Sequence, residues 1–443
     1  MNKATSYFKL SKMKYFFTVL FCFLIFNSSI TAQRSGVPIG TSSNSSNTGV
    51  SISLMKRFQH YNANPNSGND IFDNSINSPK SVNILNQKKK FYVHSLEGEN
   101  TSVYDLTTFK RIKIIKHAFN ASNQNLFANN ANNNFQFKTK NSNINYFNGK
   151  PVESCFSHNG KYLWVTYYRR SYDANAIDPS AVCIIDTDKD SIVKVMTTAA
   201  LPKMIACSPD SKTIAISHWG DNTVSLIDIS SNNPQKFTQT NNIVIDYRMN
   251  LNFSTDTKID RDKNCGNCLR GTEFTPDNKY ILVGKMGGNG IAVIDIEKRK
   301  YLGTVTGMKT NMRHLVIKDD YLYLSSNKYG YVQKTSIRDF VNHFNTGTKI
   351  EAYNKWQSAF VGIGARTISL DPTGKYLFAA INNESKVALV RTSDMKVIAS
   401  CNADSYPVGM DISEDGKILI VTAQGKTGGG GNSVMVFKVN YGE

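Results

Sequence analysis

A short phrase that recurs along this chain constrains its fold more than any other feature. The phrase is a Ser, Thr or Asp followed by turn residues, then Lys and often Tyr, then a short apolar run. Copies begin at Ser157, Ser208, Thr275, Asp371 and Ser413. A β unit of this size cannot bury its own apolar face, so such units are stable only when they stack on one another. The sequence therefore predicts a repeat protein made of β-sheets.

The spacing of the copies predicts the architecture. The copies at Asp371 and Ser413 are 42 residues apart, which matches one four-stranded blade of a β-propeller, and the longer spacings elsewhere leave room for loop insertions. Each unit also has a third strand that ends near an Asp. Seven such strands align, at 101–105, 181–186, 223–228, 291–295, 331–334, 386–390 and 433–437. We therefore expect an all-β fold, a seven-bladed β-propeller of four-stranded antiparallel blades.

The repeat resembles the YVTN family of seven-bladed β-propellers, with YncE-like, surface-layer-type repeats. Units of that family run Pro-x-x-Val-x-x-Ser-Pro-Asp-Gly-Lys, then a strand, then Val-x-Val-Ile-Asp. The resemblance covers residues 79–440, and the fifth unit is its weakest match. It implies the propeller fold and leaves the function open, because a propeller is a scaffold that serves many purposes.

Several segments lie outside the regular repeat. Residues 1–32 carry four lysines and a short apolar run, so we expect a secretory signal peptide and export to the periplasm, the cell surface or the medium. Residues 33–78 are rich in Ser, Asn and Gly and are expected to be mostly disordered. The last unit has only three strands, so we expect residues 50–58 to supply its outer strand and close the ring. An Asn-rich stretch at 120–148 is expected to be an inserted loop.

The charge of the chain indicates the kind of partner. The formal net charge is +18, and it is still +14 without the four lysines of the leader. This excess favours an anionic small molecule, a glycan or envelope polymer, or a partner protein. The longest basic run is only residues 88–90, so we do not expect nucleic acid as the partner. We expect a monomer without a transmembrane segment in the mature chain, and no cofactor or metal.

A candidate site follows from the alignment of the units. A cation stands at the start of the inner strand in four successive units, as Lys203, Arg270, Arg313 and Arg366. The loops that enter the inner strands share one face, so these side chains are expected at one mouth of the channel. The fork of arginine suits carboxylate or phosphate. The alternative is that these cations only bond neighbouring blade loops.

Other residues are expected at the rim of the same mouth. They are His218, Trp219, Lys285, Tyr329 and Arg169, and aromatic groups beside cations suit sugars or ring-bearing ligands. His218 and His314 are the two histidines expected near the channel, and no catalytic constellation can be read from the sequence. Cys265 and Cys268 are candidates for a local disulfide, because no second pair is spaced for a metal site.

Three classes of function stay open from the sequence. The first is a binding or interaction module outside the cytosol, whose channel mouth takes an anionic or glycan ligand or a partner protein. The second is a lactonase-like hydrolase that uses the histidines at the channel mouth. The third is a structural component of the envelope or surface layer. We favour the binding module over an enzyme.

Overall fold

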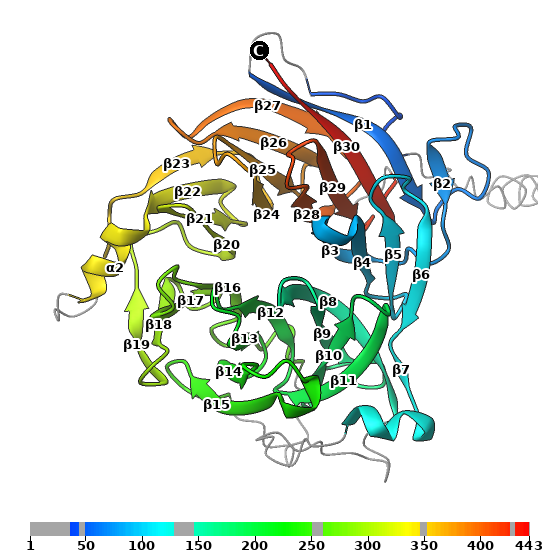
Figure 1. Ribbon diagram of the computed structural model, residues 1–443. Helices are drawn as coiled ribbons and strands as arrows, with labels where there is room; N and C mark the ends of the chain where they lie inside the picture. The colour runs from blue at the N-terminus through cyan, green and yellow to red at the C-terminus, as the bar shows by residue number, and fades with distance from the viewer. Residues whose placement is uncertain are drawn as a thin grey trace, which may run out of the picture. The chain divides into compact units, whose positions relative to one another are not determined.

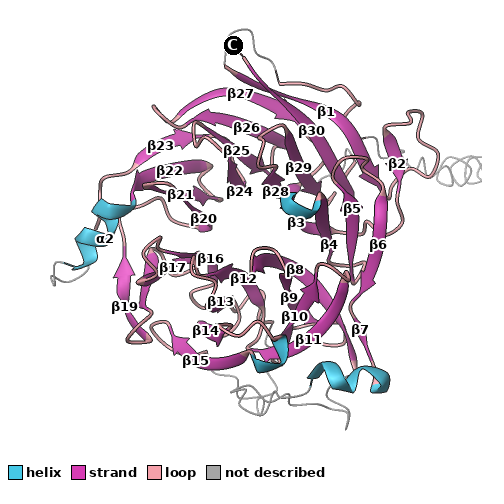
Figure 2. Ribbon diagram, in the orientation of Figure 1, coloured by secondary structure: helices cyan, strands magenta, loops and turns pink. Residues whose placement is uncertain are grey.

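Seven β-sheets surround a central channel in this computed structural model (Figures 1 and 2). The structure describes residues 36–43, 49–127, 146–249, 260–345, 352–425 and 430–442. Within them the predicted all-β, seven-bladed propeller of four-stranded blades is confirmed. The expected signal peptide at 1–32 and most of the Asn-rich stretch lie outside these residues.

The blades follow the order of the chain, and each runs from an inner to an outer strand. Blade one contains β3 (Pro79–Leu85), β4 (Lys90–Ser95), β5 (Asn100–Asp105) and β6 (Arg111–Lys116). Blade two contains β7 (Ala118–Phe119), β8 (Phe147–Ser157), β9 (Tyr162–Arg170), β10 (Ser180–Asp186) and β11 (Ser191–Thr198). Blade three contains β12 (Pro202–Cys207), β13 (Thr213–His218), β14 (Thr223–Asp228) and β15 (Thr238–Val244).

The next three blades have the same layout, and the seventh takes strands from both ends of the chain. Blade four contains β16 (Leu269–Phe274), β17 (Tyr280–Lys285), β18 (Ile291–Asp295) and β19 (Lys300–Val305). Blade five contains β20 (Met312–Lys318), β21 (Tyr321–Ser326), β22 (Tyr331–Ser336) and β23 (Gln357–Phe360). Blade six contains β24 (Ala365–Leu370), β25 (Tyr376–Ile381), β26 (Lys386–Arg391) and β27 (Lys396–Asn402). Blade seven contains β28 (Pro407–Ile412), β29 (Ile418–Ala423), β30 (Ser433–Tyr441), β1 (Val50–Gln59) and β2 (Asp70–Phe72).

Helices are few and lie between strands. They are α2 (Ile337–Asn345) and the short 3₁₀ segments η1 (Asn86–Lys88), η2 (Ala121–Phe127) and η3 (Pro234–Lys236). None of the helices in the described residues is long and apolar enough to cross a membrane.

The recurring phrase is the turn that joins the first two strands of a blade. In blade three the hydroxyl of Ser208 donates to the Asp210 carboxylate at 2.6 Å and accepts from the Thr213 N–H at 2.9 Å. Thr275 and Ser413 make the same pair of bonds in blades four and seven. A short polar side chain that bonds the backbone nearby stabilises such a turn. The phrase therefore recurs because it forms the turn.

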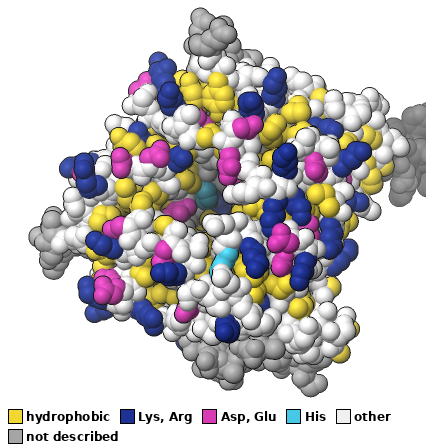
Figure 3. All heavy atoms as spheres, in the orientation of Figure 1, with side chains coloured by type: hydrophobic (Ala, Val, Ile, Leu, Met, Phe, Trp, Pro, Cys, Tyr) yellow, Lys and Arg dark blue, Asp and Glu magenta, His cyan; other side chains and the backbone are white. Residues whose placement is uncertain are grey.

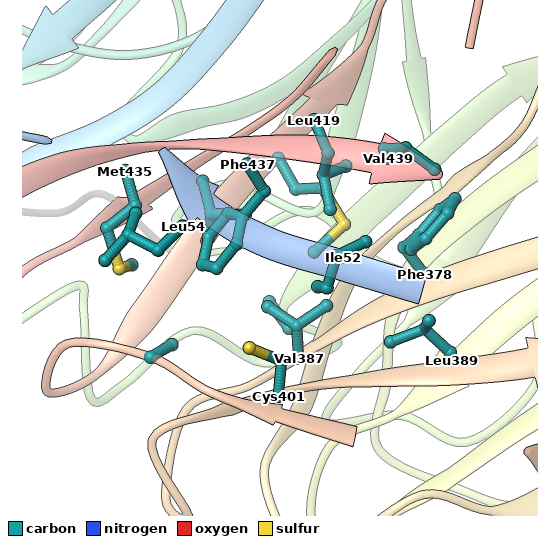
Figure 4. Close-up of a cluster of buried hydrophobic side chains, with 14 of the residues drawn as sticks. Ile52, Leu54, Phe378, Val387, Leu389, Cys401, Leu419, Met435, Phe437 and Val439 are labelled. Atoms are coloured by element: carbon teal, nitrogen blue, oxygen red, sulfur yellow. The ribbon is translucent and has the colours of Figure 1, made fainter. Parts of the chain in front are cut away.

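The ring is closed by the N-terminal strand. Strand β1 pairs antiparallel with β30, with Ile52 opposite Val439 and Leu54 opposite Phe437. Ile52 and Leu54 are buried with Phe378 and other side chains of blade six (Figure 4). This is the pairing expected from the unfinished last blade, and it leaves β30 with a neighbour on each side.

Structure also extends into the range expected to be mostly disordered. Residues 49–78 carry β1 and β2, and Asp73 and Ile76 are buried. The buried guanidinium of Arg57 bridges Asp70 and Asp404, and its nitrogen lies 3.1 Å from Asp404. These contacts hold the segment to blade seven, so a composition poor in large apolar residues did not indicate disorder here.

Candidate functional site

The inner strand of every blade has an irregularity near its start. In blades one, three, five and seven, pairing with the second strand skips the residue after the first pair, as between Pro79 and Ser81. Blades four and six skip two residues. Such a bulge leaves a residue unpaired and redirects its side chain. In five of these six blades the first skipped residue is a cation, namely Lys80, Lys203, Arg270, Arg313 or Arg366, and in blade seven it is Val408. The inner strand of blade two is irregular twice: an early gap skips Lys150, and the gap after the pair of Pro151 with Tyr167, which is the equivalent position, begins at Val152.

These five cations form one layer of positive charge, here called the cation layer. Burial lowers the pKa of Arg313, and Arg366 and Arg270 lower it further by repulsion. Burial and Arg270 likewise lower the pKa of Arg366 to about 10. The pKa of Lys80 falls well below its usual range through burial and then through the charges of Arg366, Lys203, Arg270 and Arg313. Charges that repel one another from five blades must converge on the channel.

Acidic partners for the cation layer are few. Arg270 lies 3.3 Å from a Glu153 oxygen, and Lys203 lies 3.4 Å from an Asp262 oxygen. Lys80, Arg313 and Arg366 form no ion pair with the part of the chain that the structure describes. Their direct contacts are with neutral groups, while Glu153 raises the pKa of Arg313 and Arg366 and Lys80 lowers that of Asp262 from a longer distance. Lys80 donates to the Gln424 side chain at 3.3 Å, Arg313 donates to the Asn327 side chain at 3.4 Å, and Arg366 lies 6.0 Å from the Tyr406 ring centroid.

Aromatic rings cover one side of the layer. The Lys203 amine lies 4.1 Å from the Tyr168 ring centroid and 4.8 Å from that of Trp219. The Trp219 indole donates to the Asp262 carbonyl at 3.1 Å, so this ring is held in place. Burial lowers the pKa of Lys203 to about 7. Trp219 thus lies beside Lys203 of the cation layer.

Three other residues predicted at the rim have protein partners of their own. The Lys285 amine is buried against the Asp246 carboxylate at 2.6 Å. Arg169 donates to the Ala174 carbonyl of its own loop. His218 is fully buried at the end of β13, where its Nδ1 contacts Thr223 and burial lowers its pKa to about 3. Each of these three groups is therefore engaged with its own blade or loop in the described residues.

Tyr329, the remaining residue predicted at the rim, is exposed. It lies in the turn between β21 and β22, its ring is 43% exposed, and the Lys328 amine lies 5.7 Å from the ring centroid. The ring is therefore open to solvent on blade five.

Beyond the cation layer the channel holds a cavity of about 630 Å³, here called the turn-face cavity. Its walls come from the inner strands, and Pro372 and Glu414 of the repeated turns lie at its edge. Figure 3 shows this face hollowed at its centre, with histidine and acidic side chains in the hollow. His314 lines the cavity, its Nδ1 accepts from the Ile368 N–H at 3.4 Å, and burial and Arg270 lower its pKa to about 4. Of the two predicted histidines, only His314 lines the cavity.

Sequence reasoning missed several groups of the channel. Lys80 belongs to the cation layer, but the turn after its strand is the 3₁₀ segment η1 and lacks the recurring phrase. Glu153 and Glu273 line the turn-face cavity, and so does Asp411. Burial raises the pKa of Glu273 to about 8 and that of Asp411 to about 6. Alignment of the bulge position would have found Lys80.

The cysteines divide into a disulfide and free thiols. Cys265 and Cys268 form a disulfide in the loop before β16. Cys155 and Cys207 are free thiols that line the turn-face cavity. The described residues contain no group of three or more His, Cys, Asp or Glu side chains that could hold a metal ion.

The sequence of this propeller matches a known protein family. The model of the family described as "Lactonase, 7-bladed beta-propeller" matches residues 133–441. The chain belongs to this family. A search of curated proteins found no match. The residues that match the family model include four of the five members of the cation layer.

Solved structures share the architecture. "Kuenenia stuttgartiensis Hydrazine Synthase" matches with a TM-score of 0.54 and 14% identity, over 82% of this chain and 95% of that one. The Cps50 (Swd1) β-propeller domain of Myceliophteria thermophila matches with a TM-score of 0.55 and 11% identity, over 82% and 97% of the two chains. At such identities the likeness shows the fold alone.

Proposed function

We propose that this lactonase-family propeller binds a small molecule through carboxylate or phosphate groups held by the cation layer. The observation that carries the proposal is the convergence of five cations from five blades, three of which form no ion pair within the described residues. Such charges repel one another at a cost in folding free energy. An anion placed between them would offset that cost, and arginine forks would orient it.

The aromatic rim narrows the class of ligand. Tyr168 and Trp219 lie over Lys203 and offer flat apolar faces next to the charge. A ligand with an anionic group attached to a ring, such as a sugar acid or a sugar phosphate, would contact both.

Thermal unfolding tests this binding. Sulfate and citrate serve as probes, against chloride at equal ionic strength. We expect both probes to raise the unfolding temperature of the wild type. We expect no such rise in a variant with Arg270→Gln, Arg313→Gln and Arg366→Gln.

A matched control removes three cations from the outside of the molecule, with Lys212→Gln, Lys298→Gln and Arg391→Gln. This variant should respond to the probes like the wild type. A response that survives in the triple arginine variant would overturn the anion site, and the structural role in the envelope would then be favoured.

Lactone hydrolysis is a second candidate, favoured by the family match and by Glu153. This carboxylate lines the turn-face cavity and lies 3.3 Å from Arg270. Glu153 would take a proton from water, and the water oxygen would attack the lactone carbonyl. Glu153 would then return the proton to the ring oxygen as the ring C–O bond breaks, which gives the hydroxy acid. Arg270 would stabilise the negative oxygen that forms.

Proton release from dihydrocoumarin at constant pH tests the second candidate. The wild type should hydrolyse it faster than buffer, and Glu153→Gln should abolish the difference while circular dichroism shows that the variant is still folded. A wild-type rate equal to that of buffer would rule out hydrolysis of this class of lactone, and it would not contradict the proposed anion site.

We further infer that the protein is exported and that its repeats are of the YVTN subtype. The disulfide between Cys265 and Cys268 supports an oxidising compartment. Thiol labelling of fractionated cells tests the export, because both cysteines should resist alkylation until a reductant is added.

A further inference from the structure

The turn-face cavity has the opposite charge from the cation layer. Its volume of about 630 Å³ lies in the range of small-molecule sites. The charged residues of its walls are five acids and one lysine, namely Glu153, Glu273, Asp371, Asp411, Glu414 and Lys318. One channel therefore presents cations at one level and carboxylates at another.

Two of these acids lie deep in the channel on opposite sides. Glu273 is the fifth residue of β16 in blade four, and Asp411 is the fifth residue of β28 in blade seven. Figure 1 shows β16 and β28 on opposite sides of the channel. The cations stand at the second residue of their strands, so the two levels are separated by about 10 Å along the channel.

The two carboxyls differ in their protein contacts. Asp411 accepts from the Ile84 N–H at 2.7 Å and from its neighbour Ile412 at 2.9 Å, which fixes its orientation. Glu273 lines the cavity and makes no hydrogen bond or ion pair within the described ranges. A carboxyl removed from bulk water without a partner lowers stability unless a ligand satisfies it.

The remaining walls mix apolar and polar groups. Phe156 and Val316 are among the apolar ones, and Asn83, Thr272 and Ser369 are among the polar ones. A ligand that fits this cavity is a small organic molecule with a positive group.

We propose that the turn-face cavity binds a small organic amine, with its ammonium group against Glu273 and the rest of the molecule against the other walls, which include Asp411. This site is distinct from the proposed anion site and does not depend on it. No bond forms or breaks, so the amine is a ligand and leaves unchanged.

The acids make the affinity for an amine depend on pH. Burial raises the pKa of Glu273 to about 8 and that of Asp411 to about 6, so both gain negative charge as the pH rises from 5.5 to 8. An alkylamine, like the lysine side chain, stays protonated up to about pH 10. Affinity should therefore rise over this window.

Other groups in the cavity do not reverse that trend. The pKa of His314 is lowered to about 4, and burial raises the pKa of the Cys155 and Cys207 thiols, so these three groups stay neutral from pH 5.5 to 8. The remaining charged groups that face the cavity are Glu153, Asp371, Glu414 and Lys318.

Titration calorimetry with hexylamine on the full mature chain tests the proposal, with hexan-1-ol as the uncharged probe. At pH 8 we expect hexylamine to bind about tenfold more tightly than hexan-1-ol. We also expect hexylamine to bind about tenfold more tightly at pH 8 than it does at pH 5.5. The double variant Glu273→Gln and Asp411→Asn should lose at least about tenfold in affinity at pH 8. Glu273→Gln alone should weaken binding and fold normally, because this carboxyl has no protein partner to lose.

Two control variants test whether hexylamine binds in the turn-face cavity and not elsewhere on the protein. Glu297→Gln removes an exposed carboxylate and should leave the affinity unchanged. The triple arginine variant should still bind hexylamine, because the anion site is a different one. The proposal is overturned if the wild type does not bind hexylamine at pH 8, if hexan-1-ol binds equally well, or if Glu273→Gln and the double variant both bind like the wild type.

Discussion

At the scale of single residues, the cation layer concentrates like charge where water is scarce. Arg270 and Arg366 are 3% and 2% exposed, and Arg270 alone of these two has a carboxylate within reach in the described residues. Arginine keeps its charge at all ordinary pH values, so repulsion between these groups is permanent in the absence of an anion.

Arg313→Gln should therefore stabilise the protein when no anion is present. Glutamine keeps a polar end for Asn327 and removes one of the repelling charges, so the unfolding free energy should rise by about 1–2 kcal/mol. Denaturant unfolding in chloride buffer measures the change. Arg391→Gln, at an exposed ion pair, should leave the unfolding free energy nearly unchanged. A large loss of stability in Arg313→Gln would show instead that the arginine holds the blades together.

Lys203 should make anion binding weaken with rising pH. Its pKa is lowered to about 7 by burial, so the amine loses its charge above pH 7 and the affinity for sulfate should fall between pH 7 and 9. Lys203→Arg keeps the charge and should remove most of this dependence. Titration calorimetry with sulfate at pH 6 to 9 measures it, and an affinity in the wild type that is constant over this range would contradict the prediction.

The same shift affects stability in the opposite direction. An unfolded lysine has a pKa near 10.4, so between pH 7 and 10 the folded protein binds fewer protons than the unfolded chain. The destabilising contribution of Lys203 is full below pH 7 and disappears as the pH approaches 10.

The charged residues differ in how far the sequence predicts their positions. Arg270, Arg313 and Arg366 could be placed at one mouth because aligned repeats put equivalent residues on equivalent strands. Glu273 and Asp411 could not, because an acid at an alternating position of a strand usually faces solvent, and only closure of the ring turns that face into a cavity wall.

At the scale of elements, β1 determines whether the ring is complete. It occupies the edge of β30, and its buried residues Ile52 and Leu54 fill the space between blades six and seven. The missing fourth strand of the last unit made this pairing predictable. The structure of the segment from β1 to β2 was not predictable. It is held by Arg57 and by polar contacts of Asp73, which no hydrophobic pattern indicates.

Leu54→Ala should destabilise the propeller by about 2–4 kcal/mol, because it leaves a cavity in this packed cluster. Ser51→Ala on the same strand is the control, since Ser51 is only partly buried, and it should cost less than about 0.5 kcal/mol. Chemical denaturation followed by circular dichroism measures both. Equal effects of the two changes would mean that β1 contributes little to closing the ring.

At the scale of the whole molecule, the two ends of the propeller meet. Val50 pairs with Tyr441, and the Gly442 N–H donates to the Gly49 carbonyl at 2.9 Å. Neighbouring inner strands contact one another all the way round, including β28 and β3. Closure packs each blade against two neighbours, so blades should unfold together and not one by one.

A circular permutant should therefore fold. A short Gly and Asn turn would join Tyr441 to Val50, and the new ends would lie between residues 127 and 146, in the range expected to be an inserted loop. We expect one cooperative transition, with an unfolding temperature within a few degrees of that of the wild-type chain. Calorimetry and size-exclusion chromatography measure it, and an aggregated or multi-step product would contradict closure by β1.

The skipped residue at the start of each inner strand has a consequence for how this family can change its ligands. Because that residue takes no part in the backbone ladder, its identity is free to vary while the blade stays intact. Blades two and seven already carry Val152 and Val408 there, where the other five carry cations. A new specificity can arise by exchanging single side chains at a fixed set of positions, and a designer could rewrite the channel's preference in the same way without redesigning the scaffold.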